Sequence, residues 1–150
     1  MAGFDVSNPD WKTAVEASFA RQGFMSLIGA VLEEAPAGSC RIRLPFRPDL
    51  CQQHGFFHGG LIGTLADNAG GFAAASLVAA GVEVLTVEYK LNIIAPGEGD
   101  ALVAVGTVIK NGRSLIITRV DVFSERAGEQ TLCAIAQQTI MPLAAVRVAR

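Results

Sequence analysis

Asp67 is the residue whose type and setting most clearly indicate chemistry in this sequence. It is the single charged residue within residues 59–82, which are otherwise apolar, small or uncharged. A carboxylate without partners is costly to bury, so it requires hydrogen-bond donors or an altered protonation state. Such groups gather at functional sites. The alternative is that residues 67–71 form a loop with Asp67 in water.

Two glycines that follow His58 form a second chemical feature. If a helix starts at Gly59 and Gly60, its first backbone amides have no acceptor within the helix and carry the positive end of its dipole. Glycine leaves these amides uncovered, so a carbonyl oxygen placed there would be polarised, as in an oxyanion hole. The alternative is an ordinary glycine-rich helix entry.

The spacing between these two features indicates an assembly. Gly59 and Asp67 are 8 residues apart in the sequence. On a helix that separation is ~12 Å, too far for one small carbonyl group to meet both within a single chain. A twofold dimer with antiparallel helices would place Gly59 of one subunit opposite Asp67 of the other. This geometry predicts two equivalent sites at an isologous interface.

Hydrophobic periodicity predicts the elements that must position these groups. The segment from His58 to about Ala80 is apolar nearly all round, so we expect a helix enclosed on every side. A short N-terminal helix is expected over residues 8–22, and residues 47–57 are expected to form a loop. Apolar alternation predicts strands over residues 25–35, 39–46, 83–94, 101–110, 114–124 and 130–141.

These elements predict an α+β fold in a single domain spanning residues 1–150. Asn111-Gly112 is a strong two-residue hairpin signal, which makes the neighbouring strands antiparallel. A curved antiparallel sheet of about six strands can wrap around one long central helix and bury it. We assign residues 25–141 to this core and expect a short, loosely held tail after Pro142.

Composition excludes several classes of protein. Apolar types make up 51% of the 150 residues and charged types 17%, which is too apolar for a disordered chain. A net charge of −2 without a basic run argues against nucleic-acid binding. A membrane span over residues 59–82 is disfavoured because a central Asp costs about 2.5–3.5 kcal/mol to insert.

Cysteine usage and the N-terminal sequence indicate the compartment. The cysteines are odd in number, widely spaced and form no CxxC pair, so a disulfide framework is not expected. The N-terminal residues lack a basic region followed by an apolar run, so no secretory signal is predicted. We therefore expect a cytoplasmic protein. The three cysteines are Cys40, Cys51 and Cys133.

The segment HGGLIGTLADNAGG over residues 58–71 resembles the signature of PaaI-type acyl-CoA thioesterases, a branch of the hotdog-fold superfamily. The resemblance spans about residues 25–141. It includes the strand over residues 85–89, the bend at residues 95–97 and the hairpin at residues 110–114. The family implies a hotdog fold and hydrolysis of acyl-CoA thioesters to free acid and CoA.

The resemblance also implies roles for individual residues. The Gly59 N–H, with Gly60 beside it, would polarise the thioester carbonyl. Asp67 of the partner subunit would act as general base on water or as a nucleophile, and both routes suit a carboxylate. Gln52 would position water or the carbonyl group, and Thr86 would orient water or the carboxylate. His58 would bond the loop or touch substrate.

A hairpin at Lys110, Asn111, Gly112, Arg113 and Ser114 matches a position at which relatives contact the CoA nucleotide. Lys110 and Arg113 would meet phosphates electrostatically, and the alternative is a solvated turn. CoA enters only as part of the substrate, and no other cofactor or metal is implied. The partners implied are an acyl-CoA and a second copy of the chain. A dimer is the minimum assembly, and a tetramer is left open.

Three alternatives remain open at this point. A metal site formed by Cys51, His54, His58 and Asp67 lacks a second well-spaced ligand pair. A hotdog enoyl-thioester hydratase or dehydratase would use a histidine with an acidic partner, which His58 and Asp67 permit. A catalytically inactive acyl-CoA-binding dimer would keep the fold and lose turnover. The acyl group is not specified. Phe56, Phe57 and Leu61 are candidates for an aryl or fatty-acyl pocket, and the alternative is that they belong to an interface or to the core.

Overall fold

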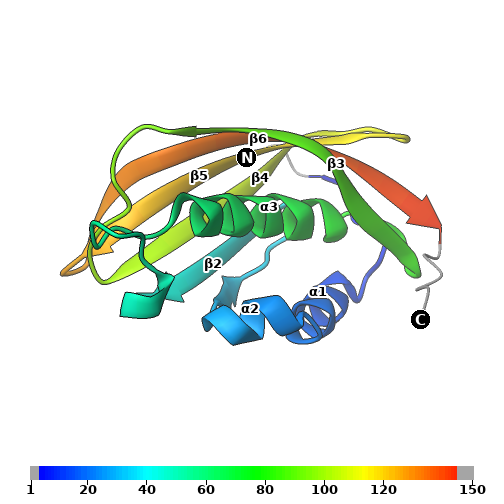
Figure 1. Cartoon of the computed structure of the whole chain (residues 1–150). Helices are drawn as coiled ribbons and strands as arrows, with labels where there is room; N and C mark the ends of the chain where they lie inside the picture. The colour runs from blue at the N-terminus through cyan, green and yellow to red at the C-terminus, as the bar shows by residue number, and fades with distance from the viewer. Residues whose placement is uncertain (1–3, 145–150) are drawn as a thin grey trace.

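A six-stranded antiparallel sheet curves around one helix in the computed structural model, which describes residues 4–144. The strand order is β1-β2-β4-β5-β6-β3, and the helix α3 lies along the concave face (Figure 1). This arrangement confirms the predicted architecture. The elements are α1 Trp11–Ala20, α2 Gly23–Ile28, β1 Val31–Glu34, β2 Ser39–Pro45, a 3-10 turn Pro48–Leu50, α3 Gly59–Ala75, β3 Val82–Ile93, β4 Ala101–Asn111, β5 Ile116–Arg126 and β6 Glu129–Ala144.

Strand periodicity decides which face of the sheet meets α3. In β2, the side chains of Cys40, Ile42 and Leu44 are fully buried, whereas Arg41 and Arg43 between them are only partly covered. This alternation is the one that the sequence predicts for a strand with one buried face. Figure 1 shows α1 and α2 on the side of α3 that faces away from the sheet. The helix is therefore packed between the sheet and this N-terminal pair.

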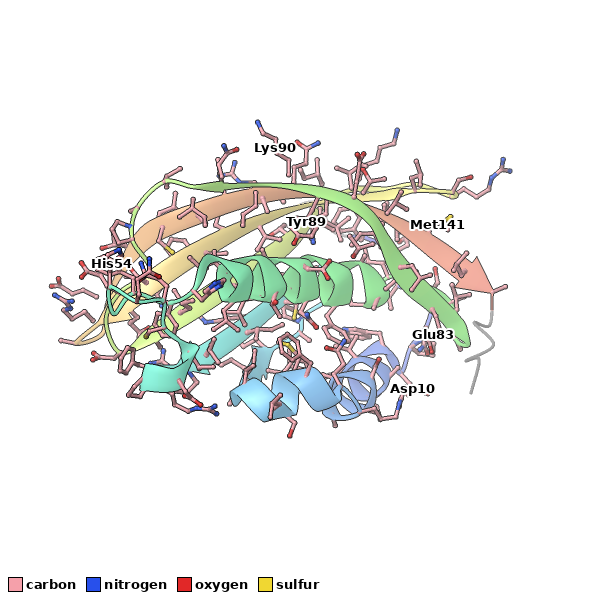
Figure 2. All side chains as sticks on the ribbon, in the orientation of Figure 1. Asp10, His54, Glu83, Tyr89, Lys90 and Met141 are labelled. Carbon is pink, nitrogen blue, oxygen red and sulfur yellow. The ribbon has the colours of Figure 1, made fainter. Side chains whose placement is uncertain are left out.

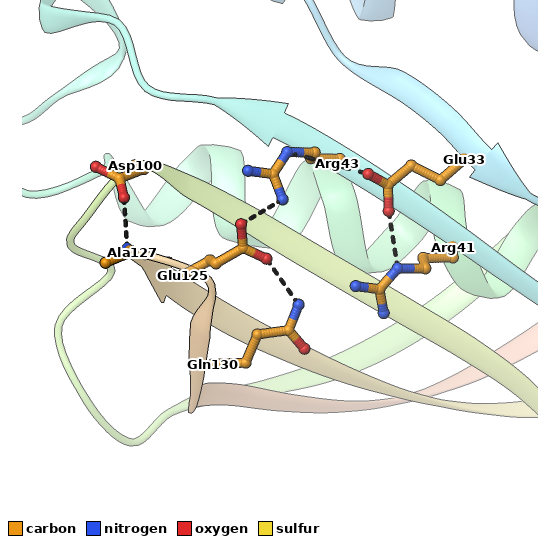
Figure 3. Close-up of polar contacts among 7 residues, drawn as sticks. All are labelled: Glu33, Arg41, Arg43, Asp100, Glu125, Ala127 and Gln130. Atoms are coloured by element: carbon orange, nitrogen blue, oxygen red, sulfur yellow. Dashed lines mark hydrogen bonds and ion pairs between the residues drawn. The ribbon is translucent and has the colours of Figure 1, made fainter.

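Polar side chains tie the strands together on the outer face of the sheet (Figure 3). Arg41 donates to Glu33 at 2.8 Å, and Arg43 pairs with Glu125 at 2.7 Å. Gln130 also donates to Glu125, and the two donors hold the pKa of that carboxyl below its usual range. These contacts link β1, β2, β5 and β6, and they lie on the face opposite α3.

Residues 25–30 are the main error of the predicted secondary structure. The sequence predicted one strand over residues 25–35, but α2 occupies Gly23–Ile28 and β1 begins only at Val31. Gly29 ends α2 in the left-handed conformation, at φ 78°, which glycine adopts without strain. The buried residues of α2 are Met25 and Ile28, a spacing typical of a helix rather than a strand.

The other differences lie at the ends of elements. α3 stops at Ala75 rather than near Ala80, because the Ser76 hydroxyl donates to Ala73 O and accepts from the Gly38 amide. The hairpin at Asn111 is present, but Asn111 pairs with Ile116, so the loop spans residues 112–115. β6 runs past Pro142 to Ala144, and the remainder of the predicted tail lies outside the described residues.

The expectation that α3 is enclosed on every side is wrong for one stripe. The sheet covers one side of the helix and α1 covers another. Between them, Thr64, Asp67, Asn68 and Gly71 remain only partly buried. No helix within residues 4–144 combines the length and apolarity needed to cross a membrane.

Candidate active site

Asp67 is held in place through one of its two carboxylate oxygens. It lies in the middle of α3, where Thr86 of β3 donates its hydroxyl proton to Asp67 Oδ1 at 2.7 Å. Gln138 of β6 donates from Nε2 to the same oxygen at 3.2 Å. Among the described residues, Oδ2 accepts no hydrogen bond, and it is not a buried atom. The carboxylate is therefore anchored at one oxygen and open at the other.

Gln138 is a functional candidate that the sequence analysis missed. Its side chain is almost fully buried, and its Oε1 accepts a hydrogen bond from the Thr118 hydroxyl at 2.9 Å. Gly70 leaves room for it, because a Cβ at that position would lie 1.5 Å from Gln138 Oε1. The available signal was a polar residue at a buried position in each of two adjacent strands, Thr118 and Gln138.

A β-bulge directs Thr86 toward the helix. The pairing of β3 with β6 shifts between Thr86 and Glu88, so Val87 is an extra residue. Without this shift, strict alternation from Thr86 would turn Glu88 and Lys90 toward α3. Tyr89 instead points to the helix and Lys90 points away from it (Figure 2). The bulge therefore allows β3 to direct Thr86 to Asp67 and, further along the strand, to direct Tyr89 to the helix.

The start of α3 offers one open amide. His58 is the N-cap, and its Nδ1 accepts from the Gly60 N–H at 2.9 Å. The amides of Leu61 and Ile62 both donate to the His58 carbonyl oxygen. The Gly59 N–H has no acceptor among the described residues. Of the two glycines, only Gly59 therefore keeps a free donor, and His58 serves as a cap.

β3 runs antiparallel to α3 along the stripe that contains both groups. A Cβ at Gly59 would lie 3.2 Å from the Ile93 side chain, and a Cβ at Gly63 would lie 3.2 Å from the Tyr89 hydroxyl. Thr86 meets Asp67 at the other end. Gly59 and Asp67 are both on this helix, 8 residues apart, so ~12 Å separates them along its axis. Within one chain, the Gly59 amide and the Asp67 carboxylate are therefore too far apart to meet one small carbonyl group.

A cavity of about 420 Å³ opens beside Asp67. It lies between α1, α3 and β3 and extends from Asp67 toward the C-terminal end of α3. Phe72 and Val84 give it apolar walls. Polar side chains stand at its rim, and Gly71 contributes a wall without a side chain. These lining residues include Ser18, Gln22 and Glu83.

The loop before α3 contains the remaining predicted contact. Gln52 Oε1 accepts from the His54 amide, and the Gln52 backbone closes the turn to Phe56. The side-chain oxygen of Gln52 is thus engaged within the loop. Phe57, a candidate for the acyl pocket, is instead part of the hydrophobic core and stacks edge-on against Phe46 at 5.6 Å.

The predicted CoA-contacting hairpin lies away from Gly59 within one chain. Asn111, Gly112 and Arg113 line a cavity of about 290 Å³ together with Leu77 and Val78, which follow the C-terminal end of α3. Lys110, Arg113 and Ser114 are exposed. The hairpin therefore lies near the C-terminal end of α3, whereas Gly59 begins that helix.

The described residues do not support a metal site. Within residues 4–144, no three side chains of His, Cys, Asp or Glu gather closely enough to hold a metal ion. The alternative built on Cys51, His54, His58 and Asp67 therefore lacks the required geometry.

Comparison with known proteins identifies the family to which the chain is related. The model of a family described as the thioesterase superfamily matches residues 54–131, just over half of the chain. A candidate esterase from Halobacterium salinarum is 30% identical over 127 residues, which cover 81% of this chain and 82% of its own length. The matched segment contains Gly59, Asp67 and Thr86 but neither Gln52 nor Gln138.

Solved structures show the same fold. A thioesterase family protein from Silicibacter pomeroyi superposes with a TM-score of 0.88 at 36% identity, covering 90% of this chain and 99% of that one. The PaaI protein of the E. coli phenylacetic acid degradation operon superposes with a TM-score of 0.80 at 19% identity, covering 93% and 96%. The hotdog fold expected from the resemblance is thus confirmed. The chain belongs to the thioesterase superfamily, whose general activity is the hydrolysis of thioesters.

Proposed function

We propose that this protein hydrolyses acyl-CoA thioesters to free acid and CoA at two equivalent sites of a homodimer. The observation that carries this proposal is the carboxylate of Asp67, anchored at Oδ1 by Thr86 and Gln138 and open at Oδ2 beside a cavity. The second half of each site is the free amide of the partner's Gly59. Neither half suffices alone within one chain.

The edge of the sheet supports the dimer. β3 pairs with β6 on one side only, so along 12 residues its other side presents unpaired backbone groups. Its exposed side chains include Leu85, Val87 and Tyr89. Long apolar edge strands readily pair with another chain. Pairing with β3 of a second copy would extend the sheet and cover these side chains.

The register of that pairing follows from the contacts within one chain. Ile93 lies over Gly59, and Thr86 lies over Asp67. Because Val87 is the extra residue of the bulge, a twofold axis at residue 90 would set Ile93 of one strand across from the partner's Thr86. Because each helix follows its own strand, Gly59 would then face the partner's Asp67.

In the proposed reaction, Asp67 and the partner's Gly59 act on the same thioester carbonyl group. Oδ2 of Asp67 takes a proton from water while the water oxygen attacks the thioester carbonyl carbon. The Gly59 amide of the other subunit donates to the oxygen on which negative charge develops. When the tetrahedral intermediate collapses, the C–S bond breaks, and the thiolate of CoA recovers the proton from Asp67. In a nucleophilic route, the same open oxygen would attack the carbonyl carbon, the C–S bond would break with departure of the CoA thiolate, and water would then hydrolyse the resulting acyl anhydride.

The remaining residues serve binding in this proposal. The acyl group enters the cavity bounded by Phe72 and Val84, which extends away from the reacting carbonyl. The side-chain amide of Gln52 donates to water or to the carbonyl group. Lys110 and Arg113 lie in the exposed hairpin and attract the phosphates of CoA from the partner side.

Thiol release from a panel of aryl, short, medium and long acyl-CoA esters tests the activity. Asp67→Asn removes the charge at nearly constant volume, so we expect a folded dimer whose kcat falls at least about 1000-fold. Asp10→Asn is the matched control, because Asp10 is exposed and its side chain makes no capping bond to α1. Wild-type kcat in Asp67→Asn would refute the mechanism. Tight binding of esters by the wild-type protein without thiol release would instead identify an inactive binding protein.

A further inference from the structure

We propose that Gln138 is a positioning residue for the reaction, set in place by Thr118 and Gly70. Its role is to hold Asp67 Oδ1 so that Oδ2 is the oxygen presented to water or substrate. This inference rests on the proposed function, because it assumes that Asp67 reacts. Gln138 itself contacts the carboxylate and does not need to touch the substrate.

Asp67 determines which end of the Gln138 amide it meets, and the Thr118 hydroxyl binds the other end. The two residues are direct cross-strand partners in β5 and β6, and both face the helix. The Thr118 hydroxyl donates to Gln138 Oε1, which leaves Nε2 for the carboxylate at 3.2 Å. An ionised carboxylate only accepts hydrogen bonds, so it requires the NH₂ end. A reversed amide would set oxygen against oxygen.

The burial of this polar pair indicates that it has a purpose other than packing. The neighbouring inward positions of the same strands hold Ile116, Val120 and Ile140, all fully buried and apolar. A buried amide or hydroxyl without partners costs free energy, and apolar residues of similar shape would fill the space without that cost. The pair satisfies its own hydrogen bonds only in combination with Asp67.

Gly70 makes the contact between helix and sheet sterically feasible. It lies three residues after Asp67 on α3, and an added Cβ would lie 1.5 Å from Gln138 Oε1 and 2.7 Å from the Thr118 hydroxyl oxygen. The side chain of Gln138 therefore crosses the space that a side chain at position 70 would occupy. Glycine at this position admits the donor, although glycine lowers helix propensity.

Two donors on one oxygen restrict how the carboxylate can turn. Thr86 approaches Oδ1 from β3, and Gln138 approaches it from β6. With Thr86 alone, the carboxylate would retain rotation about its χ2 bond, and Oδ1 and Oδ2 would exchange roles. Loss of a precise orientation lowers the rate of the chemical step more than it lowers substrate binding.

The first experiment compares Gln138→Met, Thr118→Val and Thr118→Ser with the wild-type homodimer, using the best ester of the panel. We expect kcat to fall about 10- to 100-fold in Gln138→Met and Thr118→Val, with KM nearly unchanged. Thr118→Ser keeps the hydroxyl, so it retains most of the wild-type kcat. Thermal unfolding and gel filtration of each variant show whether the fold and the dimer persist. Wild-type kcat in Gln138→Met would overturn the proposal, and wild-type kcat in Thr118→Val would overturn the part assigned to Thr118.

The second experiment uses a readout that a purely structural role would not change. Gln138→Glu places a second carboxylate within hydrogen-bonding distance of Asp67, and two such groups do not readily carry charge together. We expect the acid limb of its kcat–pH profile to move to higher pH, whereas Gln138→Met leaves that limb in place. Glu83 is the other titratable group lining the cavity, and it is unchanged in both variants. An acid limb at the wild-type pH in Gln138→Glu would overturn the proposal.

Asp67→Asn, measured alongside, separates the two levels of inference. If Asp67→Asn remains active, the proposed function fails and the positioning role fails with it. If Asp67→Asn is inactive while Gln138→Met turns over like the wild type, only the positioning role fails.

Discussion

Two adjacent glycines of α3 provide a matched test of the cavity and of the anchored carboxylate. Nothing lies within 4 Å of a Cβ added at Gly71, which lines the cavity, whereas one added at Gly70 collides with Gln138. Both substitutions to alanine gain the same helix propensity, about 1 kcal/mol. Only Gly70→Ala adds an overpacking cost, which is typically about 1–3 kcal/mol. We therefore expect Gly71→Ala to be more stable than Gly70→Ala by that cost.

The stability difference is directly measurable. For a domain of this size, 1 kcal/mol corresponds to about 2–4 °C in Tm, so the two variants should differ by about 2–12 °C. Gly71→Ala should also unfold above the wild type. Equal Tm values for the two variants, measured by calorimetry, would refute the packing reasoning at Gly70.

Larger side chains at Gly71 test where the acyl group lies. Gly71 follows Asp67 by one helical turn, ~6 Å along the axis, so an acetyl group does not reach it. The four side-chain carbons of Gly71→Leu would displace about three or four acyl methylenes, each contributing about 0.8 kcal/mol. The expected loss is about 50- to 200-fold in kcat/KM for esters long enough to pass position 71, and little for acetyl-CoA.

The assay is thiol release from straight-chain esters of increasing length by the wild type, Gly71→Ala and Gly71→Leu. The chain length at which the loss begins should fall as the side chain grows. An equal loss for acetyl-CoA and for long esters would show that this cavity does not receive the acyl group.

Three further predictions concern assembly, CoA binding and pH. Val87→Lys places a charge on the free edge of β3, so gel filtration with light scattering should detect a monomer with little activity; an active monomer would contradict the shared site. Arg113→Ala should raise KM for acyl-CoA severalfold at low salt without raising KM for a short thioester that lacks the nucleotide; equal effects would exclude a phosphate contact. Burial raises the pKa of Cys40 to about 12 and that of Cys133 to about 11, from an ordinary value of 9.0. Above pH 9 the unfolded state loses thiol protons that the folded state keeps, so the free energy of unfolding falls as pH rises toward 11, by up to about 1.4 kcal/mol per unit for each thiol. The double variant Cys40→Ala/Cys133→Ala should show a shallower fall in urea titrations, and an unchanged slope would contradict this assignment.

Local sequence patterns predicted most of the helices and strands correctly. The alternation of Cys40, Ile42 and Leu44 predicted a strand with one buried face, and the structure confirms it. The glycine-rich segment after His58 predicted the central helix. Residues 25–30 were assigned incorrectly because six apolar-rich residues fit both the helical and the strand period. The left-handed conformation of Gly29 ends the helix at this point.

The sequence by itself determined that Asp67 is the lone charge of α3 and that Gly59 precedes it by 8 residues. Both are properties of near neighbours along the chain, which spacing and the helical period fix. Only the tertiary structure decided which carboxylate oxygen stays open, because the second donor to Oδ1 comes from Gln138, 71 residues further along the chain. That contact depends on the strand order β5-β6-β3, on the bulge at Val87 and on the space left by Gly70. None of these is set by local periodicity, since each arises where segments distant in sequence pack together.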